Sequence, residues 1–196
     1  MKSDLRRMYR NGKTGVEPSL SMDGVLKAVT RGLITVDDAI DIIGGDDPLA
    51  IIKATKLKEI SGACNKTIVA GVDLEFAGET VHFNLKTEDQ SNIANLFRVI
   101  ELGGTEFPYQ ADGGISRIYT AAEIVQIYVA AQTLITAQTI YHNSLKSYVQ
   151  TLTTAEDIAT IVYGMELPEP YKTEVDKKLA VAQEQMDSIL TKIGVA

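Results

Sequence analysis

The sequence contains no tryptophan, one cysteine and two histidines among 196 residues. A single cysteine, Cys64, excludes an intramolecular disulfide framework and is typical of assembly in a reducing cytoplasm. Aromatic residues are 6% of the chain and apolar residues 45%, so we expect an aliphatic core. Histidine and cysteine are common in catalytic and metal-binding sites, and this chain has few of either. No two of them have the spacing of zinc ligands. We therefore expect no enzymatic activity, no metal site and no cofactor.

Recognisable nucleotide-binding and nucleophile motifs are also missing. The glycine pairs at 44–45, 103–104 and 113–114 do not fit a phosphate-binding loop, and no serine lies in a G-x-S-x-G setting. No uncharged apolar run approaches the roughly 18–20 residues that a membrane span needs. The charged N-terminal stretch has no apolar segment behind it, so it does not predict a secretion signal.

The formal charge of −7 is unevenly distributed along the chain. Residues 1–32 carry seven Lys and Arg residues against three Asp and Glu residues, a net +4, which leaves −11 for the rest. A basic start on an acidic body could contact nucleic acid or an acidic partner surface, including that of another copy. The alternative is an ordinary solvated face.

The longest helical pattern runs from Thr120 to Leu152. It begins with Thr120-Ala-Ala-Glu123, a capping box in which the hydroxyl and the carboxylate accept hydrogen bonds from backbone N–H groups. Apolar residues then recur at steps of three and four and form a wide stripe that includes Ile124, Tyr128, Ala131, Ile135, Leu145 and Val149. We therefore expect one long helix that the rest of the domain covers.

The preceding residues predict a mixture of helix and strand. A helix is expected from Leu49 to about Val69, and alternation of apolar and polar residues over 72–85 predicts a β-hairpin. Residues 105–119 contain a turn signal between short alternating runs, which indicates a second small hairpin or an irregular arm. His82 is expected on the polar side of the first hairpin, beside carboxylates, and Cys64 in the core.

Two further capping boxes are predicted. Thr87-Glu-Asp-Gln90 would begin a helix that ends near Leu102. Thr153-Thr-Ala-Glu156 would separate the long helix from a short one that ends at Gly164.

The first 45 residues predict two or three short helices. The first would end at Asn11-Gly12, the second would begin after Ser21 and the third after Thr35. Since so small a head buries little apolar surface alone, we expect it to pack on the body or on another chain.

The C-terminal residues predict an amphipathic helix set off by Pro168 and Pro170. Its apolar residues recur at steps of four and three, as in a heptad seam: Val175, Leu179, Ala182, Met186, Ile189 and Ile193. Such a helix could pair with another chain or dock on its own domain, and fewer than three heptads leave both readings open. We treat these six residues, the heptad seam, as a candidate oligomer or partner interface.

The predicted fold class is therefore α+β and mostly helical. It comprises a helical head (1–45), a central domain of helices around one long helix with one or two hairpins (46–165), and a linker with the heptad helix (166–196).

Two stretches resemble known protein families. Residues 25–44, with Gly32-Leu-Ile-Thr35 and Ile42-Ile-Gly44, resemble the short XkdX-like proteins of phage and prophage tail gene clusters. Residues 53–164 resemble an uncharacterised domain of phage tail and tail-fibre proteins, with Cys64, Asp89-Gln-Ser-Asn92 and Tyr141-His-Asn-Ser-Leu-Lys146 in similar places. The tryptophan common in the middle arm of such domains is missing here.

These resemblances imply a structural protein of a phage or phage-like tail. It would be an oligomeric connector at the tail tip, baseplate or fibre attachment, assembled in the host cytoplasm and located in the virion. Its partners would be copies of itself, with a trimer as one option, and other tail proteins, with no nucleic acid and no membrane span. The alternatives are a small DNA-binding regulator that uses residues 2–43, and, third, a hydrolase acting on the cell wall.

Overall fold

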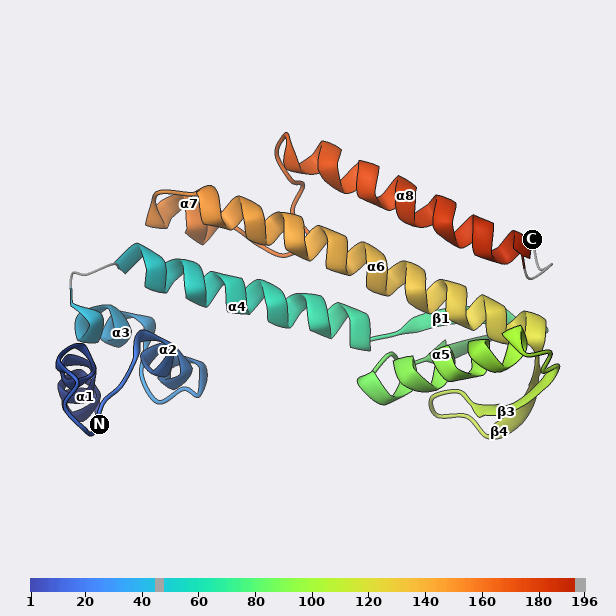
Figure 1. The fold of residues 1–196 in the computed structure, drawn as a ribbon, viewed down its shortest axis with the longest axis horizontal. Coiled ribbons are helices and arrows are strands. Elements are labelled where there is room, and N and C mark those ends of the chain that lie inside the picture. The colour runs from blue at the N-terminus through green and yellow to red at the C-terminus, as the bar shows by residue number, and fades with distance from the viewer. Residues whose placement is uncertain (45–47, 193–196) are drawn as a thin grey trace. The chain divides into compact units, whose positions relative to one another are not determined.

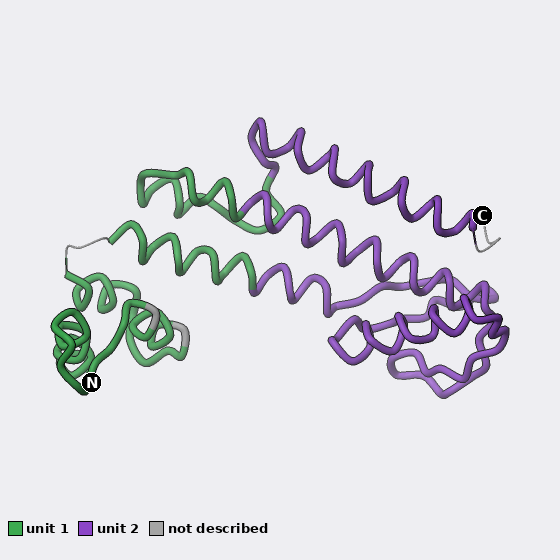
Figure 2. The backbone as a smooth tube through the Cα atoms, in the orientation of Figure 1, with its two compact units in different colours: residues 1–61, 146–165 green, residues 62–145, 166–196 purple. Residues whose placement is uncertain are grey.

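The structure, a computed structural model, describes residues 1–44 and 48–192. Over these residues it contains eight helices and two separate two-stranded antiparallel sheets (Figure 1), which confirms the mostly helical α+β class. The chain divides into two compact units, residues 1–61 with 146–165 (unit 1) and residues 62–145 with 166–196 (unit 2) (Figure 2). The division at 45 and 165 expected from sequence stays a prediction.

The head, in unit 1, consists of α1 (Lys2–Thr14), α2 (Met22–Thr30) and α3 (Val36–Ile43). The N-cap hydroxyls of Ser21 and Thr35 accept hydrogen bonds from the backbone, as their positions in the sequence predict. The buried cluster of the head draws one residue from α4 (Pro48–Val69): Tyr9, Val25, Ala28, Ile34, Ala39, Ile42, Ile43 and Ile51. The head thus buries its apolar side chains with the help of the next helix of the same chain.

The predicted end of the first helix at Asn11-Gly12 is wrong. The helix continues to Thr14 and ends at Gly15, whose φ is 74°. Gly12 lies within α1, where a Cβ atom would come 2.6 Å from the carbonyl oxygen of Leu20. The glycine therefore permits a close approach of two backbone segments and does not stop the helix.

Elsewhere in unit 1, two lysines of α4 reach carbonyl groups at the ends of other helices. Lys53 donates to the Gln150 oxygen at 2.7 Å, near the end of α6 (Ala121–Thr151). Lys56 donates at 2.9 Å to the Ile161 oxygen, just after α7 (Ala155–Thr160). Cations are favourable at the negative ends of helices. The short helix ends at Thr160, not at Gly164 as expected.

Unit 2 contains both hairpins. In the first, β1 (Val72–Phe76) pairs with β2 (Glu79–Phe83) across a two-residue turn of Ala77 and Gly78, both with positive φ. In the second, β3 (Glu106–Gln110) pairs with β4 (Ser116–Thr120). The second hairpin settles the alternative that the sequence left open for residues 105–119. Between the hairpins lies α5 (Thr87–Glu101).

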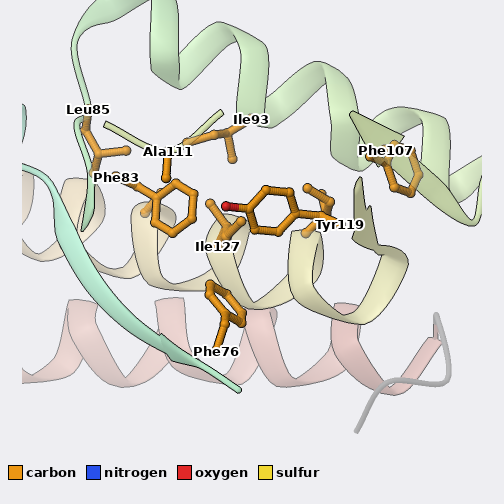
Figure 3. Close-up of a cluster of buried hydrophobic side chains, with 10 residues drawn as sticks. Phe76, Phe83, Leu85, Ile93, Phe107, Ala111, Tyr119 and Ile127 are labelled. Atoms are coloured by element: carbon orange, nitrogen blue, oxygen red, sulfur yellow. The ribbon is translucent and has the colours of Figure 1, made fainter. Parts of the chain in front are cut away.

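The core of unit 2 is more aromatic than the overall composition suggests. The rings of Phe76, Phe83 and Tyr119 meet edge to face, with centroids 6.0–6.1 Å apart (Figure 3). Aliphatic residues of α5 and α6, including Ile93, Ile124 and Ile127, complete the same buried cluster. The expectation of an aliphatic core is therefore incomplete for this unit, because its few aromatic residues are concentrated in one place.

Of the three predicted capping boxes, one forms at the predicted residues. The Thr120 N–H donates to Glu123 at 2.8 Å and the Glu123 N–H donates to the Thr120 hydroxyl at 3.3 Å. The N-cap of α5 is Lys86, one residue before the predicted Thr87, and the Lys86 N–H donates to Asp89. The N-cap of α7 is Thr154, one residue after the predicted Thr153, and its hydroxyl accepts from the Asp157 N–H.

Candidate functional site

The predicted interface lies on α8 (Tyr171–Lys192) in unit 2. Polar contacts fix the start of this helix, because Glu169 accepts hydrogen bonds from the N–H and the hydroxyl of Thr173 at 3.3 and 2.7 Å. Lys172 forms an ion pair with Glu166 in the preceding segment. That pair raises the pKa of Lys172 and lowers the pKa of Glu166, chiefly through their hydrogen bond.

The heptad seam occupies the more buried face of α8. Val175 is 9% exposed, and Leu179, Ala182, Met186 and Ile189 are half-buried. Residues on the other faces are exposed, including Lys177, Val181 and Glu184. Ile193, the last position of the seam, lies outside the described residues.

A groove of about 420 Å³ lies between α8 and the neighbouring part of α6. Leu179, Ala182 and Met186 line it from α8, and the residues from α6 are Gln132, Thr133, Thr136 and Ala137. Three of the four lining side chains of α6 are short, so α6 lies beside the seam without filling the groove. The seam thus lies against its own chain and still presents partly exposed apolar side chains.

Two basic residues at the start of α1 pair with carboxylates of α3. The Lys2 ammonium lies 2.6 Å from the carboxylate of Asp38 and 2.9 Å from that of Asp41. Arg6 donates to the Asp41 carbonyl at 3.1 Å and lies 3.4 Å from its carboxylate. The hydrogen bonds from Lys2 lower the pKa of both carboxyl groups. Two cations of α1 are therefore engaged by the acidic helix α3.

His82 lies where the sequence predicts, at the surface beside carboxylates. Its Nδ1 atom is 2.7 Å from Asp73 and its Nε2 atom 3.2 Å from the Asn84 side-chain oxygen. The bond to Asp73 is the main reason that the pKa of His82 is raised above its usual 6.5. Cys64 is buried, as predicted, and its Sγ lies 3.6 Å from the Gln138 carbonyl oxygen.

The part of the chain that the structure describes shows neither a metal-binding cluster nor a membrane-spanning helix. No group of three or more His, Cys, Asp and Glu side chains in that part of the chain could hold a metal ion. No helix within residues 1–44 and 48–192 is long and apolar enough to cross a membrane.

Sequence reasoning missed the two lysine contacts described above and a pocket at the end of β2 that Asn84, Asp89 and Asp112 help to line. Lys56 and Ile161, for example, are 105 residues apart in the chain. No spacing rule connects such positions, so only the fold reveals them.

These features define a mostly helical α+β protein with a partly open helical seam. Residues 51–162, which are 112 of the 196 residues, match the family described as Domain of unknown function (DUF4376), and the chain belongs to that family. The matched range extends from the first turn of α4 to just beyond α7, so α1–α3 and α8 lie outside it. No curated protein and no solved structure matches the chain.

Proposed function

We propose that this chain is a structural virion protein of a bacteriophage or phage-like tail. It acts as an oligomeric connector at the tail tip, baseplate or fibre attachment, and it is assembled in the host cytoplasm. The tail assignment draws on the resemblances of residues 25–44 and 53–164, since the family description itself names no function.

The observation that carries the connector mechanism is the partly open heptad seam. Leu179, Ala182 and Met186 line a groove that α6 leaves unfilled. A helix from another copy, or from a neighbouring tail protein, would bury these apolar side chains and gain the free energy of removing them from water. Binding is thus the whole mechanism, and a homo-oligomer, with a trimer as one option, is the expected product.

The test compares two substitutions of the same kind on one helix. Leu179→Asp places a carboxylate on the seam, whereas Val181→Asp places it at a position that is 54% exposed. Light scattering after size-exclusion chromatography should show an oligomer for the full chain and for Val181→Asp. It should show a smaller species for Leu179→Asp, because burying an unpaired charge is costly.

A truncation that ends at Glu169 removes the seam altogether and should give the same smaller species. Circular dichroism of each variant establishes that the remaining helices are intact. If the full chain is already monomeric, or if Val181→Asp dissociates the oligomer as strongly as Leu179→Asp, the seam is not the assembly element.

The alternative function, a DNA-binding regulator that uses residues 2–43, has one favourable observation. Arg7, Arg10 and Lys13 are exposed on α1. Against it, Lys2 and Arg6 are paired with carboxylates of α3, the helix that a helix-turn-helix would present to DNA.

A further inference from the structure

A small polar pocket lies in unit 2 where three segments end together. These segments are the end of β2, the start of α5 and the turn that follows β3. Phe83 and Ala111, both buried, are part of its lining. The polar lining consists of Asn84, Asp89, Tyr109, Gln110 and Asp112. The volume is about 200 Å³, below the roughly 300–1,000 Å³ of sites for drug-sized ligands, so the pocket suits a single ring.

Hydrogen bonds within the protein hold the polar wall in place. Asp89 accepts from the Lys86 N–H at 3.2 Å, and the Gln110 amide donates to the Gly114 carbonyl at 2.9 Å. The side-chain oxygen of Asn84 pairs with His82 at 3.2 Å. The backbone N–H of Asp112 donates to the His82 carbonyl at 3.0 Å, which ties the turn to β2. Because these side chains are already held in place, the protein loses little conformational entropy when a ligand binds.

Each of these side chains keeps hydrogen-bonding capacity for a ligand. Among the described residues, the second carboxylate oxygen of Asp89, the Gln110 oxygen, the Asn84 NH₂ group and the Asp112 carboxylate have no further hydrogen-bond partner. Acceptors therefore outnumber donors in the wall. A ligand that supplies several O–H donors matches this arrangement, and two carboxylates disfavour an anion.

The pocket also offers an aromatic surface. The Tyr109 ring is half-buried and lies parallel to Phe83, with centroids 6.3 Å apart and an interplanar angle of 6°. This stacking fixes the orientation of the tyrosine at the pocket. An aromatic side chain beside planar carboxylates and amides suits a ligand with both C–H faces and hydroxyl edges.

We propose that this pocket binds one pyranose ring of an uncharged saccharide. Hydroxyl groups of the sugar donate to Asp89, Gln110 and Asp112, the Asn84 NH₂ donates to a sugar oxygen, and Tyr109 contacts the ring. All the residues of this site lie outside α8, so the proposal does not depend on the heptad seam or on the tail assignment.

The test is an NMR titration of the full, ¹⁵N-labelled chain with glucose, galactose, rhamnose and N-acetylglucosamine. At least one sugar should shift the side-chain amide signals of Asn84 and Gln110 saturably. Asp112→Asn should weaken this binding at least about tenfold, as loss of a charged hydrogen-bond acceptor commonly does. Asp112 is exposed and its carboxylate supports no hydrogen bond of the fold among the described residues, so the variant should keep the native spectrum.

The matched control is Glu79→Gln, which removes a carboxylate from the exposed turn end of the first hairpin, away from the pocket lining. It should bind the sugar as the unaltered chain does. The proposal is overturned if none of the four sugars gives saturable shifts, or if Glu79→Gln weakens binding as much as Asp112→Asn. It is equally overturned if calcium or choline shifts the two amides and no sugar does.

Discussion

At the scale of single residues, two glycines with nearly equal φ angles have different surroundings. Gly71 has φ 82° and Gly78 has φ 83°. A Cβ atom on Gly71 would lie 2.1 Å from the Phe83 carbonyl oxygen, whereas one on Gly78 would meet nothing within 4 Å. The left-handed conformation disfavours both substitutions, and a backbone clash is added only at Gly71.

Gly78→Ala should therefore cost about 1–2 kcal/mol of unfolding free energy, the penalty of a left-handed residue. Gly71→Ala should cost more, about 3 kcal/mol or above, because β2 must also move. Urea denaturation followed by circular dichroism measures both. Equal losses would mean that the two strands are not held as closely as the structure places them.

His82 gives a prediction about pH. Its pKa is raised in the folded state, mainly by the hydrogen bond to Asp73, so this pair stabilises the fold fully below the ordinary histidine pKa. The contribution is lost as pH rises through the raised pKa. Because His82 is 38% exposed in its side chain, the effect should be small.

Asp73→Asn should lower the pKa of His82 in an NMR titration. It should also flatten the decline in stability between about pH 5 and 8, the range in which histidines titrate. Glu75→Gln, on the same strand but opposite Thr80, is the control and should leave the titration unchanged. An unaltered His82 pKa in Asp73→Asn would show that the ion pair does not form in solution.

At the scale of the elements, two threonines that the sequence presents as N-caps have different roles. Thr120 caps α6, since its hydroxyl accepts from the Glu123 N–H and the Glu123 carboxylate reaches back to its N–H. Thr87 lies inside α5, whose N-cap is Lys86. The same substitution should therefore have different consequences at the two positions.

Thr120→Ala should cost about 0.5–2 kcal/mol, the usual range for a lost N-cap. Thr87→Ala should be close to neutral, because alanine is a good helix former and no cap is lost. Thermal unfolding of the two variants in parallel measures the difference. A larger loss of stability in Thr87→Ala than in Thr120→Ala would indicate that Thr87, as the sequence predicts, is the N-cap of α5.

At the scale of the whole molecule, charge distinguishes the connector from the DNA-binding alternative. The chain has a formal net charge of −7. In its basic first 32 residues, Lys2 and Arg6 form ion pairs with carboxylates of α3. We expect no mobility shift of random duplex DNA at low salt, since affinity depends on cations available to phosphates. A salt-sensitive shift that Arg10→Ala weakens would support the regulator.

Periodicity in the sequence predicted the main helices and the first hairpin, and several element boundaries were misplaced by one to four residues. The predicted helix over Thr120–Leu152 corresponds to α6, and the alternating residues 72–85 form the first hairpin. The heptad spacing placed the seam on one face of α8, whose residues are more buried than their neighbours. These features depend on contacts between residues a few positions apart, which periodicity and capping record directly.

Contacts between residues far apart in the chain became visible only in the folded structure. It showed that Gly12 permits the close approach of the Leu20 backbone and that Lys56 reaches the Ile161 carbonyl. It also brought Asn84, Asp89 and Asp112 from three segments to one pocket. The physical reason is that such contacts depend on how the elements pack, because a side chain meets residues far along the chain only after the backbone has folded.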